Sequence, residues 1–66
     1  MDIKYPSVRV RLTGTDGNAY AILGKVETAL LRYGISKDAC DEFITEATSG
    51  SYEELLATCA RWVTVS

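Results

Sequence analysis

The sequence contains no histidine, so its two cysteines and its serines have no imidazole to activate them. Histidine is the side chain whose protonation changes most readily near neutral pH, and it serves most often as general acid or base. No obvious buried carboxylate takes its place, and no cluster shows metal-ligand spacing. We therefore expect a non-enzymatic protein with no catalytic residue, no metal site and no cofactor.

Cysteine is also too scarce for a disulfide scaffold, and no apolar run is long enough for a signal peptide or a membrane span. These absences predict a cytoplasmic protein without membrane contact. Cys40 and Cys59 fall on apolar helical stripes, so we expect both thiols to be reduced and buried. A disulfide between them is an alternative if their helices face each other.

The chain has 66 residues, 47% of them hydrophobic, and a formal net charge of -2. This length predicts one domain over residues 1–66, with a marginal core because so short a chain buries only about 60% of its unfolded surface. The negative net charge argues against a protein that binds nucleic acid through its overall positive charge. Charge is segregated, because residues 36–54 carry six carboxylates against Lys37 alone.

The first regular element is a strand in which apolar and polar residues alternate: Val8, Val10 and Leu12 with Ser7, Arg9 and Arg11. Pro6 is tolerated at its beginning and limits how far pairing extends backwards. The strand ends in a glycine turn over residues 13–18. A second strand is expected at the other end of the chain, where residues 62–65 are rich in strand formers.

Three helices are expected between the strands. The first covers about residues 19–33, is capped by Asp16 or Asn18, and ends at a left-handed Gly34. Ser36 opens the second helix, and a capping box of Ser51 and Glu54 opens the third. Gly24 inside the first helix predicts a close crossing of another backbone, because glycine costs about 1 kcal/mol there relative to alanine.

These elements predict an α+β fold in β-α-α-α-β order, with three helices packed on a short two-stranded sheet. The direction of strand pairing is not determined by the pattern, although simple alternation favours parallel strands.

The glycine turn is one candidate site, because a strand, a glycine turn and a helix start can hold an anion on backbone N–H groups. The residues in question are Gly14, Thr15, Gly17 and Asn18. The spacing matches neither a P-loop nor a dinucleotide fingerprint, and Asp16 would repel an anion. A tight turn with a capping side chain is the simpler interpretation.

The second candidate is an interaction surface made of Arg9, Arg11, Tyr20 and Lys25. The arginines project from one strand face about 6.5–7 Å apart, and Tyr20 lies off the apolar stripe of its helix. Aromatic residues and arginine are enriched at protein interfaces. The simpler interpretation is that charged side chains keep an exposed strand soluble.

The favoured function is therefore a non-enzymatic protein–protein interaction module with an unidentified protein partner. A homo-oligomer is an alternative, with the first or last strand as its seam. A less favoured alternative is a nucleic-acid-associated regulator that uses Arg9, Arg11, Lys25 and Arg61.

Two stretches carry a resemblance. One is residues 11–24, RLTGTDGNAYAILG, and the other is residues 46–52 followed by Leu55-Leu56, Cys59 and Trp62-Val63. They resemble patterns in small uncharacterised bacterial and bacteriophage proteins, over nearly the whole chain. The resemblance implies a short stand-alone protein carried by phage or other mobile DNA, and it supplies no catalytic residue.

Overall fold

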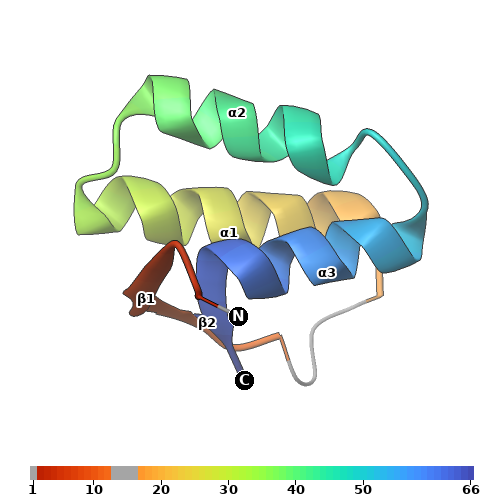
Figure 1. Cartoon of the computed structure of the whole chain (residues 1–66), viewed down its shortest axis with the longest axis horizontal. Coiled ribbons are helices and arrows are strands. Elements are labelled where there is room, and N and C mark those ends of the chain that lie inside the picture. The colour runs from red at the N-terminus through yellow and green to blue at the C-terminus, as the bar shows by residue number, and fades with distance from the viewer. Residues whose placement is uncertain (1, 13–16) are drawn as a thin grey trace.

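The computed structural model describes residues 2–12 and 17–66 and confirms the expected order of elements (Figure 1). The chain forms β1 (Tyr5–Val10), α1 (Ala19–Tyr33), α2 (Lys37–Ala47), α3 (Tyr52–Trp62) and β2 (Val63–Val65). The result is a small α+β domain whose two strands come from opposite ends of the sequence.

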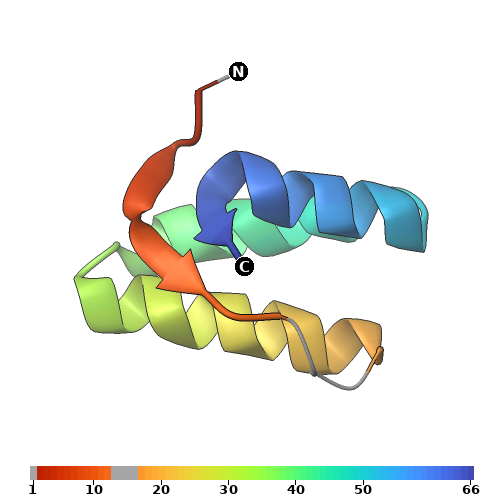
Figure 2. The ribbon, with the colours of Figure 1, turned by 90° about the horizontal axis from the view of Figure 1, so that it is seen from below.

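The helices and strands are arranged in layers. α1 and α3 lie side by side, α2 covers one side of this pair, and the strands lie on the other side (Figure 1). Seen from below, β1 runs between α1 and the α3–β2 segment (Figure 2). β1 therefore has α1 beside it along one edge and β2 along the other.

β1 and β2 pair in parallel, which is the direction that the alternation of elements favours. The register joins Tyr5 to Val63 and Arg9 to Thr64, with an irregularity between Tyr5 and Arg9. Pro6 lies at the beginning of β1 as expected, but pairing continues one residue before the proline, to Tyr5. The irregularity accommodates Pro6, whose carbonyl accepts a 2.7 Å hydrogen bond from the hydroxyl of Thr64.

Each helix begins where the sequence predicts. The N-cap side chains accept hydrogen bonds from backbone N–H groups in the first turn: Asn18 from Tyr20, Ser36 from Ala39 and Ser51 from Glu54. α1 ends at Gly34, whose φ of 103° is the expected left-handed conformation. These caps fix the length of α1, along which the candidate site lies.

The core is formed by one apolar face of every element. Its fully buried side chains include Val26 and Leu30 of α1, Phe43 of α2 and Val63 of β2. The Trp62 ring lies 5.4 Å from the Phe43 ring and 5.8 Å from the Tyr5 ring, centroid to centroid. Because Trp62 directly precedes β2, this aromatic cluster holds the end of α3 and the sheet against α2.

Candidate functional site: a basic groove between β1 and α1

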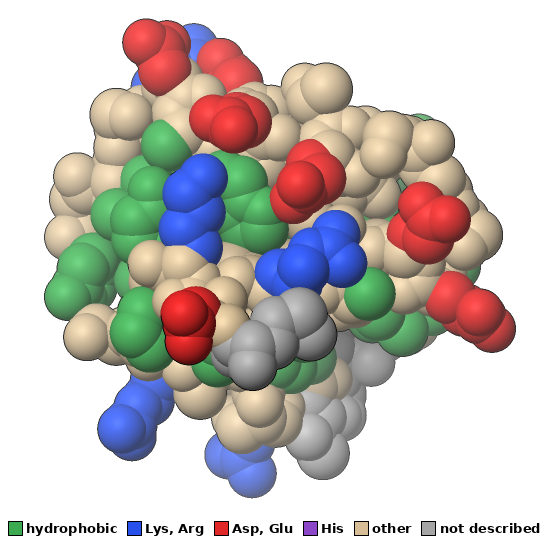
Figure 3. Space-filling view, viewed as in Figure 1, with side chains coloured by type: hydrophobic (Ala, Val, Ile, Leu, Met, Phe, Trp, Pro, Cys, Tyr) green, Lys and Arg blue, Asp and Glu red, His purple; other side chains and the backbone are tan. Residues whose placement is uncertain are grey.

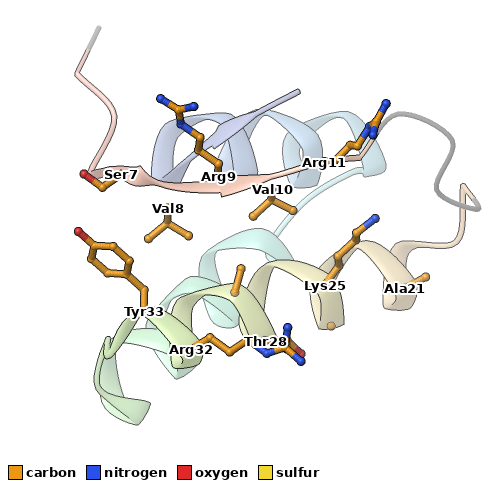
Figure 4. A pocket seen from close by; sticks show the side chains of 12 residues that line it. Ser7, Val8, Arg9, Val10, Arg11, Ala21, Lys25, Thr28, Arg32 and Tyr33 are labelled. Atoms are coloured by element: carbon orange, nitrogen blue, oxygen red, sulfur yellow. The ribbon is translucent and has the colours of Figure 1, made fainter.

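A groove of about 750 Å³ lies between β1 and α1 (Figure 4). One side consists of residues 7–11. The other side is a face of α1, made of Ala21, Gly24, Lys25, Thr28, Ala29, Arg32 and Tyr33. The volume is in the range of small-ligand sites.

The alternation of β1 gives the groove an apolar floor and a charged rim. Val8 and Val10 point toward α1 and are each 3% exposed. Arg9 and Arg11 point to the opposite face of the strand, and Lys25 reaches up from α1 toward the strand (Figure 4). The arginines therefore stand on the solvent side of β1 while the valines close the core beneath it.

The backbone of β1 also contributes to the groove. The Val10 carbonyl accepts a 3.0 Å hydrogen bond from the N–H of Ser66, and the Leu12 N–H donates one of 2.9 Å to the Ser66 carbonyl. Backbone groups of successive strand residues point to opposite edges. The N–H and C=O groups of Arg9 and Arg11 therefore point away from β2, to the side of the strand that borders the groove; we call this side the outer edge of β1.

The outer edge has no neighbouring strand in the described part of the chain, because the sheet contains only β1 and β2. The α1 surface next to the outer edge has few protruding atoms at Ala21, Gly24 and Thr28, because these residues have small side chains or none. The groove thus combines strand backbone groups with a shallow helix surface that an extended chain could lie on.

The described lining of this groove includes no carboxylate. It includes four of the seven basic residues of the chain: Arg9, Arg11, Lys25 and Arg32. Most of the acidic residues belong to α2 and the first turn of α3, and Figure 3 shows carboxylates spread over that side: Asp38, Asp41, Glu42, Glu46, Glu53 and Glu54. A protein with a net charge of -2 therefore presents a positive groove on its strand side. Side chains of one sign around a concavity attract a ligand of the opposite sign.

The sequence-predicted surface is partly brought together. Arg9, Arg11 and Lys25 all line the groove, with the two arginine side chains on the solvent face of β1, whereas Tyr20 is 84% exposed and does not line it. Arg61, which the nucleic-acid alternative includes, donates a 3.0 Å hydrogen bond to Thr58 and lies outside the groove lining. The basic surface is therefore a β1–α1 feature that does not extend to α3.

Arg32 and Tyr33 are groove residues that the sequence analysis missed. A signal for Arg32 was present, because Lys25, Thr28 and Arg32 follow the three- and four-residue spacing of one helix face. The missing information was that this face borders β1. Tyr33, 57% exposed, points toward the β1 side of the groove and supplies the aromatic ring that was expected from Tyr20 (Figure 4).

Gly24 requires a correction. A close backbone crossing was expected there, but a Cβ atom added at Gly24 would have no heavy atom within 4 Å. The glycine lines the groove and faces open space. Core packing therefore does not account for a residue that costs α1 about 1 kcal/mol, whereas an open groove floor does.

The glycine turn is a weaker candidate for a binding site than the basic groove. Gly14 and Thr15 lie outside the described residues. The Asn18 side chain accepts a 2.8 Å hydrogen bond from the N–H of Tyr20, as a helix cap does. Gly17 lies near the hydroxyl of Tyr52, which would be 3.9 Å from a Cβ atom built there. The capping interpretation is confirmed for Asn18, whose oxygen takes an N–H group that an anion would need.

Cys40 and Cys59 are buried, unbonded thiols, as expected for a reduced protein. Burial raises the pKa of both, and the nearby carboxylates of Glu27 and Asp41 raise the pKa of Cys40 further. A raised pKa keeps the thiol protonated, and the thiolate is the nucleophilic form. Neither cysteine therefore has the environment of a catalytic nucleophile.

Comparisons of the sequence and fold with protein-family models, curated proteins and solved structures give no match. Within residues 2–12 and 17–66, no helix is both long and apolar enough to cross a membrane. In the same residues, no group of three or more acidic, cysteine or histidine side chains could hold a metal ion. The groove is therefore the feature of this protein that indicates a function.

Proposed function

We propose that this protein is a non-enzymatic interaction module that binds an acidic region of a protein partner in the β1–α1 groove. The observation that carries the proposal is the gathering of Arg9, Arg11, Lys25 and Arg32 around one concavity in a chain of net negative charge. Such a groove favours carboxylate ligands by charge complementarity, and arginine binds carboxylates in a bidentate manner.

Solubility alone is a weaker explanation of these charges. Charged residues that protect an edge strand need to lie on the strand itself, as Arg9 and Arg11 do. Lys25 and Arg32 lie across the groove on α1, where they protect no strand edge. Gly24, which lines the groove next to Lys25, leaves the groove open at a cost in helix stability.

The test is a titration of the ¹⁵N-labelled protein with a short polyglutamate peptide. We expect amide shifts at groove positions and weaker binding by Arg9→Gln and Arg32→Gln. Lys37→Gln is the matched control, because Lys37 is exposed on α2 and does not line the groove. Shifts centred on α2 or α3, or equal weakening by all three variants, would contradict the proposal.

A nucleic-acid-associated regulator is the second candidate, and the same four basic side chains favour it. Phosphate binding releases counterions, so its affinity falls steeply with salt, in proportion to the number of phosphates neutralised. We expect an oligothymidylate to bind more weakly than polyglutamate at equal salt. Tighter binding of the oligonucleotide, lost on adding salt and on Arg9→Gln, would favour this second candidate.

We also infer a cytoplasmic location, because two buried thiols suit a reducing compartment. The resemblance to small bacterial and phage proteins supports an origin on mobile DNA. A homodimer is disfavoured at β1, because pairing two copies of this strand would bring arginines of both copies together.

A further inference from the structure

We propose that the partner segment binds as an added β-strand on the outer edge of β1, with acidic and small apolar residues alternating along it. This inference rests on the proposed function and specifies how the groove is used. It makes the two-stranded sheet three-stranded, with the new strand lying on α1.

The backbone geometry supports strand addition. The N–H and C=O groups of Arg9 and Arg11 point to the outer edge, as the hydrogen bonds of Val10 and Leu12 to Ser66 establish. An extended peptide lying there makes main-chain hydrogen bonds to β1 in the manner of known strand-addition complexes. Residues 7–11 line the groove, a length of about 16 Å at strand spacing.

The α1 side of the groove has the shape that an added strand needs. A strand beside β1 would lie over the surface of α1 formed by Ala21, Gly24 and Thr28. These positions leave room for a second backbone, and a Cβ atom at Gly24 would meet nothing within 4 Å. Alternate side chains of the added strand would point onto this surface, which suits small or β-branched apolar residues.

The remaining side chains of the added strand would point to the solvent face, beside Arg9 and Arg11 (Figure 4). Directly opposed residues on neighbouring strands have Cβ atoms about 4.5–5.5 Å apart, close enough for charged pairs to interact. Opposite two arginines, carboxylates are favoured and basic residues are disfavoured. The expected ligand therefore alternates glutamate or aspartate with residues such as valine or threonine.

A second copy of β1 would not fit this description, because it would place its own Arg9, followed by Arg11, where carboxylates are expected. A single-stranded nucleic acid offers phosphates to the arginines, but it has no alternating N–H and C=O groups for the strand edge. The strand edge therefore favours a peptide over both.

The experiment uses an acetylated and amidated peptide that alternates glutamate with valine, and two N-methylated versions of it. In one version the valine nitrogens are methylated, and in the other the glutamate nitrogens. Successive N–H groups of a strand point to opposite edges, so only one set can bond to β1. Affinity is measured by calorimetry, and exchange of the Arg9 amide hydrogen is measured by NMR.

We expect the unmodified peptide to bind and to slow exchange at Arg9. One methylated version should lose about tenfold or more in affinity, since several backbone hydrogen bonds are removed, while the other should bind nearly as well as the parent. Gly24→Gln should weaken binding by filling the groove floor.

Equal effects of the two methylation patterns, or unchanged exchange at Arg9, would overturn strand addition. The proposed function stands without this binding mode if polyglutamate still changes the NMR shifts of the groove amides and Arg9→Gln still weakens polyglutamate binding. If no acidic peptide binds in the groove and an oligothymidylate does, both proposals fail together.

Discussion

Trp62 donates a hydrogen bond of 2.5 Å from its indole nitrogen to the carboxylate of Glu46, and so joins the end of α3 to the end of α2. The ring itself is only 4% exposed. The ammonium group of Lys4 lies 4.1 Å from the ring centroid on a segment preceding β1. One indole therefore holds together a helix pair and the chain segment that leads into the groove strand.

Replacing Glu46 by alanine should destabilise the protein, because it leaves the N–H of a buried indole without its acceptor. The expected loss in the free energy of unfolding is about 1–2 kcal/mol, measured by urea denaturation. Glu42→Ala is the control, since Glu42 is exposed on the same helix and carries the same charge. Equal losses in the two variants would show that the indole contact contributes nothing specific.

The two glycines of the α1 region should respond to alanine in opposite directions. Gly24→Ala should raise the free energy of unfolding by about 1 kcal/mol, because the helix gains propensity and the new methyl group meets open space. Gly34→Ala should lower it by about 1 kcal/mol, because the φ of 103° at this cap disfavours a side chain. Thermal unfolding of both variants checks this.

A loss of stability in Gly24→Ala would mean that the glycine has a role in folding. In that case the open groove would not explain the presence of glycine at position 24.

The ends of the helices are determined by local interactions, which is why the sequence predicts them. The capping residues Asn18, Ser36 and Ser51, together with Gly34, determine helix ends through bonds to residues two to four positions away. Because each capping residue is close in sequence to the backbone group it bonds, the helix boundaries and the fold class could be predicted.

The groove could be predicted only in part, because it depends on which elements are neighbours in space. Arg9 and Arg11 were recognised from strand alternation, and Lys25 from its charge. Arg32 and Tyr33 lie more than 20 residues from β1 in the sequence, and nothing local indicates that α1 borders its outer edge. The close backbone crossing expected at Gly24 was wrong for the same reason, because the sequence shows a glycine in a helix but not whether another segment packs against it.

The two thiols should make the protein less stable at alkaline pH. Burial raises the pKa of Cys40 and Cys59 in the folded state, so the folded protein retains protons that the unfolded chain releases. The stabilising effect is fully present below the unfolded thiol pKa of about 8.5 and is lost as pH rises through the folded value. Urea denaturation at a series of pH values measures the slope.

A Cys40→Ala, Cys59→Ala double variant should show a shallower decline between about pH 8 and 10. A thiol reagent added at neutral pH should label the native wild-type protein slowly and the unfolded chain rapidly. Fast labelling of the native state, or an unchanged alkaline slope in the double variant, would contradict burial of the thiols.

Finally, the arginine on the outer edge of β1 should keep copies of this protein apart. Edge strands with exposed backbone groups tend to pair with other strands, and charged side chains suppress this. Arg9→Val leaves a strand former at the centre of an uncovered edge. We expect the variant to associate as its concentration rises, with light scattering on a sizing column as the measurement. Arg32→Leu is the matched control, because it removes the same charge from the α1 side of the groove and leaves β1 unaltered. Association of Arg9→Val alone would assign protection to the strand edge, whereas equal association of both variants would assign it to net charge.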